Sequence, residues 1–158
     1  MTNRISPLAP FRHDTFRIIW IASLASNFGG LIQAVGAAWL MTSISQSVNM
    51  VALVQASISL PIMLFSLVSG ALADNFDRRR IMFVAQTFML VVSALLTVFA
   101  YLGLITPWLL LLFTFLIGCG TALNNPSWQA SVGDMVPRND LPAAVALNSM
   151  GFNITRSV

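Results

Sequence analysis

Two long stretches of this chain contain no formally charged residue. They cover residues 18–73 and 81–133, and only residues 74–80 lie between them. As a single helix, the first stretch would be about 84 Å long at about 1.5 Å per residue. The hydrocarbon core of a bilayer is about 30 Å thick and takes about 20 residues per crossing. Each stretch is therefore predicted to cross a membrane twice.

The composition agrees with a membrane protein. Of the 158 residues, 57% are hydrophobic and 8% are charged, whereas soluble domains have roughly 25% charged residues. The few arginines have no long polar face to occupy, so the net charge of +3 does not favour nucleic-acid binding. Cys119 is a lone thiol in an apolar run, which excludes a disulfide framework within the sequence. We find no nucleophile–base pair, metal-ligand cluster or phosphate loop, and we expect no enzymatic activity, metal or cofactor.

Hydropathy and turn residues divide the chain into a cytoplasmic N-terminal segment, residues 1–15, and a helical membrane region, residues 16–158. The predicted spans are residues 16–42, 50–73, 81–101 and 108–125, followed by a fifth helix that begins at about residue 141. Pro126 is predicted to kink or end the fourth span. Asp140 suits an N-cap position and Pro142 the first turn of the fifth helix.

The arginines predict the orientation. They are placed on one side of the predicted membrane, and the two turns on the other side, residues 43–49 and 103–107, carry no charge. Basic residues concentrate in cytoplasmic segments, so we expect the N-terminus and residues 74–80 to lie in the cytoplasm. The arginines on this side are Arg4, Arg12, Arg17, Arg78, Arg79, Arg80 and Arg138, with Arg156 just inside the fifth helix.

The segment between the two charge-free stretches has chemistry beyond orientation. Gly70 and Ala73 are small enough for another helix to approach closely. Asp74 stands near a helix C-terminus, where the macrodipole disfavours an anion, so a nearby cation or another helix N-terminus must favour it. Residues 78–80 are cations at a helix N-terminus, and they can pair with Asp74, Asp77 or lipid phosphates. A plain positive anchor at the membrane surface is the alternative interpretation.

Residues 70–79, GALADNFDRR, resemble the loop between the second and third helices that marks the major facilitator superfamily. Asn75 and Asp77 depart from that pattern, where relatives have Arg and Gly. Residues 124–156 resemble the connection between the fourth and fifth helices in the exporter branch related to enterobactin and macrolide efflux proteins. The resemblance covers essentially the whole chain. The residues that match the loop pattern are Gly70, Leu72, Ala73, Asp74, Arg78 and Arg79.

The resemblance implies an all-α fold of twelve membrane helices in two six-helix halves. This chain would supply four helices and the start of a fifth, so we expect an N-terminal fragment whose partners are the remaining C-terminal helices, the lipid bilayer and a small-molecule substrate. In that family the loop Asp engages the other half and latches the cytoplasmic side shut. By position, Asp74 would be the latch, Gly70 would permit the close approach, and Arg78 and Arg79 would tune the charge network.

Polar side chains inside the spans are expected to face the bundle interior or a watery cavity. Packing between helices through hydrogen bonds is the alternative role for each of them. Arg156 is the candidate for an intramembrane charge, or else an arginine that reaches the membrane interface. The candidates for cavity lining are Asn27, Gln33, Gln55, Asn124 and Asn125.

The sequence and the resemblance together predict a secondary transporter. We expect it to export a small amphipathic molecule by alternating access. The alternative is a small integral membrane protein that binds or stabilises a partner in the membrane without transport.

Overall fold

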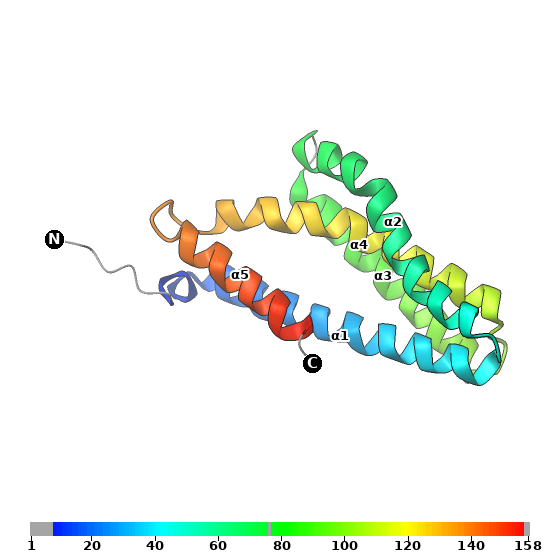
Figure 1. Cartoon of the computed structure of the whole chain (residues 1–158). Coiled ribbons are helices and arrows are strands. Elements are labelled where there is room, and N and C mark those ends of the chain that lie inside the picture. The colour runs from blue at the N-terminus through cyan, green and yellow to red at the C-terminus, as the bar shows by residue number, and fades with distance from the viewer. Residues whose placement is uncertain (1–7, 76, 157–158) are drawn as a thin grey trace. The chain divides into compact units, whose positions relative to one another are not determined.

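The computed structural model describes the backbone of residues 8–75 and 77–156, and the side chains of residues 66–68, 70–75, 134 and 156 lie outside the described part. Over the described residues the fold is entirely helical, with no strand (Figure 1). This confirms the predicted all-α class. The elements are η1 (Ala9–Arg12), α1 (Asp14–Ile44), α2 (Val48–Asn75), α3 (Arg78–Tyr101), α4 (Pro107–Met135) and α5 (Leu141–Arg156).

Within the described residues, four helices are long and apolar enough to cross a membrane, as the charge-free stretches predict. Several helices continue beyond the predicted spans. Helix α2 runs to Asn75 and α3 begins at Arg78, so most of the charged segment at residues 74–80 is helical rather than a loop. The four crossings lie within Asp14–Ile44, Val48–Phe65, Arg78–Tyr101 and Pro107–Gly133.

The chain forms two compact units. One consists of Met1–Gln33 with Gln129–Val158, and the other is Ala34–Trp128. Helices α1 and α4 therefore each contribute residues to both units. In the second unit, a core of apolar side chains joins the end of α1, the start of α2, the end of α3 and the start of α4. Met41 and Leu110 are fully buried there, and Phe99 packs on Phe113 with ring centroids 5.7 Å apart.

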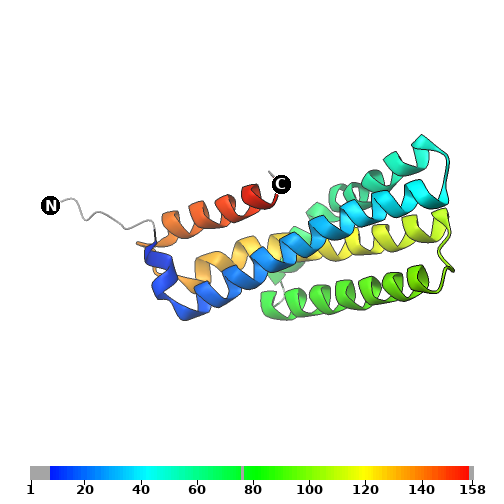
Figure 2. The same ribbon diagram turned by 90° about the horizontal axis from the view of Figure 1, so that it is seen from below.

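Small residues of α4 set the close contacts of the second unit. A Cβ on Gly118 would lie 2.6 Å from the carbonyl oxygen of Ile58 in α2, so the two backbones meet at this point. Two residues later, Gly120 packs against the side chain of Met89 in α3. Figures 1 and 2 show α3 and α4 side by side over this region. A helix that is apolar all round gains close packing in this way, since small residues let backbones approach.

The first unit combines the N-terminal segment, α1 as far as Gln33, the end of α4 and helix α5. The 3-10 helix η1 contacts α5, and Figure 1 shows η1 beside the start of α5. Phe11 packs edge-on against Trp20, with ring centroids 5.1 Å apart. Phe16 is fully buried, as is Ala144 of α5. Aromatic and small residues thus form the interior of this unit.

Pro126 does not end the fourth helix. Helix α4 continues to Met135, past residue 125, where the predicted fourth span ends. Proline removes one helical hydrogen bond, but membrane helices tolerate it because nearby hydroxyls and neighbouring helices satisfy backbone carbonyls. The hydroxyl of Ser127 donates to the carbonyl of Leu123, 3.2 Å away, within this region.

The start of the fifth helix agrees with the sequence. Helix α5 begins at Leu141, directly after Asp140, with Pro142 in its first turn. The carbonyl of Asp140 accepts the first helical hydrogen bond, from the N–H of Ala144 at 2.9 Å. A proline is tolerated here because the N–H groups of a first turn have no partner within the helix.

Candidate gating segment and polar sites

The candidate gating segment spans the end of α2 and the start of α3. Gly70, Leu72, Ala73 and Asp74 belong to the last turns of α2, and their side chains lie outside the described residues. Arg78 and Arg79 are the first two residues of α3. The segment therefore places Asp74 within the last turn of one helix and the arginines at the start of the next. Its role as a latch stays a prediction.

Asp77 has a local role that the sequence analysis did not assign. It is the N-cap of α3, with an extended backbone, and its Oδ1 accepts the backbone N–H of Arg79 at 2.9 Å. Its Oδ2 lies 3.8 Å from Nε of Arg80. A carboxylate at a helix N-terminus satisfies a free N–H and favours the dipole. Asp77 therefore offsets the unfavourable placement of the arginines, and an Asp directly before an apolar helix is the signal that predicts such a cap.

Among the polar candidates of the second unit, Asn124 is engaged in helix packing. Its Oδ1 accepts a hydrogen bond from Nε2 of Gln86 across α3 and α4, at 3.3 Å. The sequence analysis missed Gln86, although an amide inside an apolar span is itself a signal for a polar contact. Asn125 is half-buried beside it in the sequence. In this structure Asn124 therefore has the alternative role given above, a hydrogen bond between packed helices.

Gln55 lies on an exposed face of α2 and bonds within its own helix. The hydroxyl of Ser59 donates to the carbonyl of Gln55 at 2.9 Å, and Nε2 of Gln55 lies 3.5 Å from the Ser59 hydroxyl. These contacts join Gln55 to Ser59, one turn further along α2. Gln55 and Asn124 belong to the second unit, whereas Asn27 and Gln33 belong to the first, so the structure does not describe the five candidates as one site.

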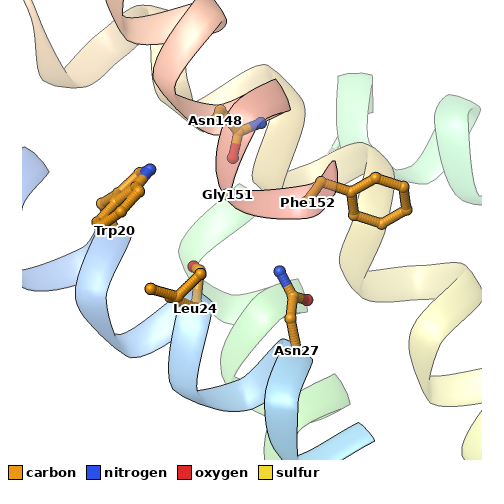
Figure 3. A pocket seen from close by; sticks show the side chains of 7 residues that line it. Trp20, Leu24, Asn27, Asn148, Gly151 and Phe152 are labelled. Carbon is orange, nitrogen blue, oxygen red and sulfur yellow. The ribbon is translucent and has the colours of Figure 1, made fainter. Parts of the chain in front are cut away.

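Asn27 lies at a small hollow between α1 and α5 of the first unit (Figure 3). The cavity volume is about 10 Å³, which is room for one water-sized group. In Figure 3 the side chain of Asn27 points from α1 toward α5, and Asn148 lies on α5. The sequence analysis did not single out Asn148 as a site residue. The lining residues are Trp20, Ser23, Leu24, Asn27, Asn148, Gly151 and Phe152.

Trp20 joins the two helices at one side of this hollow. Its Nε1–H donates to the carbonyl of Leu147 in α5 at 3.2 Å. The indole ring also lies against Gly151, where an added Cβ would be 3.4 Å from the ring carbon Cζ2. The sequence analysis did not predict a contact for Trp20. An indole inside a span has a single N–H donor to satisfy, and here a helix carbonyl supplies the acceptor.

The N-terminal segment and the start of α5 are joined by a polar contact. Nε2 of His13 lies 3.2 Å from Oδ2 of Asp140, and the two side chains are 36% and 22% exposed. The sequence analysis did not predict this pair, because 127 positions separate the two residues. Next to it, Arg17 pairs with Asp14 at 2.8 Å within the first turn of α1. The contact between His13 and Asp140 joins the N-terminal segment to the connection between α4 and α5.

The remaining candidate is Arg156, the last residue of α5, whose side chain lies outside the described residues. Among the residues that the structure does describe, no cluster of three or more His, Cys, Asp or Glu side chains could hold a metal ion.

Comparison with known proteins identifies the family. The sequence profile of the family described as transmembrane secretion effector, within the major facilitator superfamily, matches residues 5–158. The chain belongs to this family. The match covers nearly the whole chain, including the candidate gating segment and helix α5. No solved structure matches the chain.

Curated relatives of the family include transporters from several bacteria. The chain is 27% identical over 131 residues to the staphyloferrin A transporter of Staphylococcus aureus, covering 82% of this chain and 33% of that protein. It is 25% identical over 147 residues to macrolide efflux protein A of Streptococcus pyogenes, covering 90% of this chain and 36% of that protein. The macrolide efflux protein A of Enterococcus faecalis is 29% identical over 103 residues. The chain thus spans about a third of the length of these relatives.

Proposed function

We propose that this chain forms the first spans of a secondary active exporter that moves a small amphipathic molecule across a bacterial inner membrane by alternating access. The observation that carries the proposal is the match of residues 5–158 to the transmembrane secretion effector family. The four helices that are long and apolar enough to cross a membrane support it. Relatives that transport staphyloferrin A or efflux macrolides support the export of a small molecule.

The orientation follows from the arginines. Arg12 and Arg17 flank the start of α1, and Arg78–Arg80 begin α3, whereas residues 45–47 and 102–106 at the other ends of these helices carry no charge. Basic residues are retained on the cytoplasmic side. We therefore place the N-terminus and the turn between α2 and α3 in the cytoplasm.

Asp74 is the residue we assign to gating. It stands in the last turn of α2, where the negative end of the helix dipole disfavours a carboxylate unless another group compensates. Asp77 already serves the start of α3 as its N-cap and as the partner of Arg80. In this proposal, Asp74 contacts a helix N-terminus in the second half of the complete transporter, and breaking that contact opens the cytoplasmic side.

The proposal is tested by the Asp74→Asn variant of the complete transporter, expressed in a strain that lacks its own efflux pumps. We expect export of a labelled macrolide to be lost while the amount of protein in the membrane stays the same, because Asn keeps the shape of Asp but not its charge. Asp77→Asn is the matched control, since Asn is also a good N-cap, and it should retain export. Wild-type export rates in Asp74→Asn would refute the gating role.

A further inference from the structure

His13 is the single histidine of the chain, and it takes part in a contact between segments that are far apart in the sequence. Its Nε2 lies 3.2 Å from Oδ2 of Asp140. Carboxylates and guanidinium groups ordinarily keep their charge between pH 5 and 8, whereas an imidazole gains a proton as the pH falls through that range. The contact therefore joins a carboxylate to a kind of side chain that changes its charge near neutral pH.

A second contact ties the same two segments together in the same register. The indole N–H of Trp20 donates to the carbonyl of Leu147 at 3.2 Å, and 127 positions separate this pair, as they separate His13 from Asp140. The two contacts are therefore seven residues apart on each segment, which is about 10 Å along a helix. An indole and a backbone carbonyl do not titrate between pH 5 and 8. Trp20 thus holds the register at any such pH, while the contact of His13 can change in strength.

His13 stands where η1 meets α1. Its backbone N–H donates to the carbonyl of Pro10 at 3.1 Å, and its own carbonyl accepts the backbone N–H of Arg17 at 3.0 Å. Ala9 and Pro10 are buried, and η1 contacts α5 (Figure 1). The strength of the contact between His13 and Asp140 therefore affects how often η1 leaves α5.

The charges around the contact decide the sign of the effect. Asp14 and Arg17 pair with each other at 2.8 Å within the first turn of α1. A protonated imidazole near the start of α5 meets the positive end of the helix dipole. The carboxylate of Asp140 offsets this, because a charge-assisted hydrogen bond is roughly twice as strong as one between neutral groups. The remaining charged residues of the first unit are Arg12 and Arg138, which are exposed, and Arg4, Asp134 and Arg156, whose side chains lie outside the described part. Protonation of His13 therefore strengthens the contact.

We propose that His13 and Asp140 form a pH-sensitive fastening, which holds the N-terminal segment on α5 more tightly as the pH falls. At low pH the protonated imidazole donates a charge-assisted hydrogen bond to the carboxylate, and this extra strength is lost as the pH rises and the proton leaves. The two side chains are 36% and 22% exposed, so we expect the effect of a partly exposed ion pair, about two- to fivefold in the open population of η1. The fastening goes beyond the proposed export function and does not depend on it.

The test measures how often η1 opens in the complete transporter, held in lipid nanodiscs. Ala9 is 8% exposed, so in Ala9→Cys the thiol reacts with N-ethylmaleimide mainly when η1 leaves α5, and all other cysteines are replaced by serine. The labelling rate with Asp140→Asn is divided by the rate of the parent at pH 8 and at pH 6, which cancels the pH dependence of the thiol reaction. We expect this ratio to be about two- to fivefold larger at pH 6.

Asp77→Asn is the matched control, because it makes the same change at the N-cap of α3, and its ratio should be the same at both pH values. A rise at pH 6 in Asp140→Asn alone supports the fastening. An unchanged ratio in Asp140→Asn overturns it, and so does an equal rise in Asp77→Asn.

His13→Gln is the second variant, and it decides the matter if Asp140→Asn does not fold. Glutamine keeps an N–H donor but does not titrate. Relative to the parent, His13→Gln should be labelled about two- to fivefold faster at pH 6 than at pH 8. A rate relative to the parent that is equal at both pH values means that the proton on His13 does not strengthen the contact, which overturns the fastening.

Discussion

Replacing Gly118 by alanine should separate α2 from α4. The added Cβ would stand 2.5 Å from Cγ of Pro61 and 2.6 Å from the carbonyl oxygen of Ile58. Ordinary contact begins at about 3.4 Å, so the two backbones must move apart by about 0.8 Å, since neither a proline ring nor a helix carbonyl can turn aside. Overpacking of this kind costs about 1–3 kcal/mol, and the better helix propensity of alanine returns up to about 1 kcal/mol. We expect a net loss of about 1–2 kcal/mol in the free energy of unfolding.

The assay is unfolding of the purified complete transporter in mixed micelles. Gly36→Ala is the matched control, because among the described residues no atom outside the helix's own backbone near Gly36 lies within 4 Å of an added Cβ. It should be as stable as the wild type or more stable. If Gly118→Ala unfolds at the same denaturant concentration as Gly36→Ala, the close approach of α2 and α4 at this point is wrong.

Three further predictions concern caps, turns and polar contacts. Asp77→Ala should lower the free energy of unfolding by about 1 kcal/mol through loss of the N-cap of α3, whereas Asp77→Asn should not, and equal stability of the two would contradict the cap. Gly103 has a φ of +69° after α3, so Gly103→Ala should cost about 1–2 kcal/mol in the same unfolding assay, and no loss would show that the turn adopts another conformation. A double-mutant cycle of Gln86→Leu and Asn124→Leu should give a coupling energy of about 0.6 kcal/mol, and additive effects would exclude the hydrogen bond between α3 and α4.

The crossings could be predicted from the sequence because they depend on one-dimensional quantities. The charge-free stretches fix how many times the chain must cross. The turn at residues 45–47 falls within the predicted turn at 43–49, and the turn at residues 102–106 overlaps the predicted turn at 103–107. The helix ends could not be placed as well. Hydropathy marks where apolar residues stop, whereas a helix stops where its backbone loses hydrogen bonds or gains a cap. Helix α2 therefore runs on through Asp74 to Asn75, and α4 continues past Pro126 to Met135.

The polar partners could not be predicted, and the reason lies in the helices themselves. A soluble helix shows an apolar stripe that marks its inward face, but these helices are apolar on all sides. Leu110 is fully buried and Leu112 is exposed, although both are leucines and only two positions separate them. Without a stripe, the rotation of each helix is set by contacts that the sequence does not rank, so it could not show that Asn124 would meet Gln86 while Asn27 would lie near Asn148.

Small residues do not remove this ambiguity. Gly118 and Gly120 mark close helix contacts. In the part of the chain that the structure describes, however, no other helix comes within 4 Å of a Cβ added at Gly29, Gly30 or Gly36. A glycine permits a close approach without requiring one, so its presence in a span predicts an opportunity and not a partner. The two groups of glycines differ in the atoms that lie opposite them. Gly118 faces a backbone carbonyl and a proline ring of α2, groups that only a residue without a side chain can approach so closely. The Gly118→Ala and Gly36→Ala pair therefore measures a distinction that composition alone cannot make.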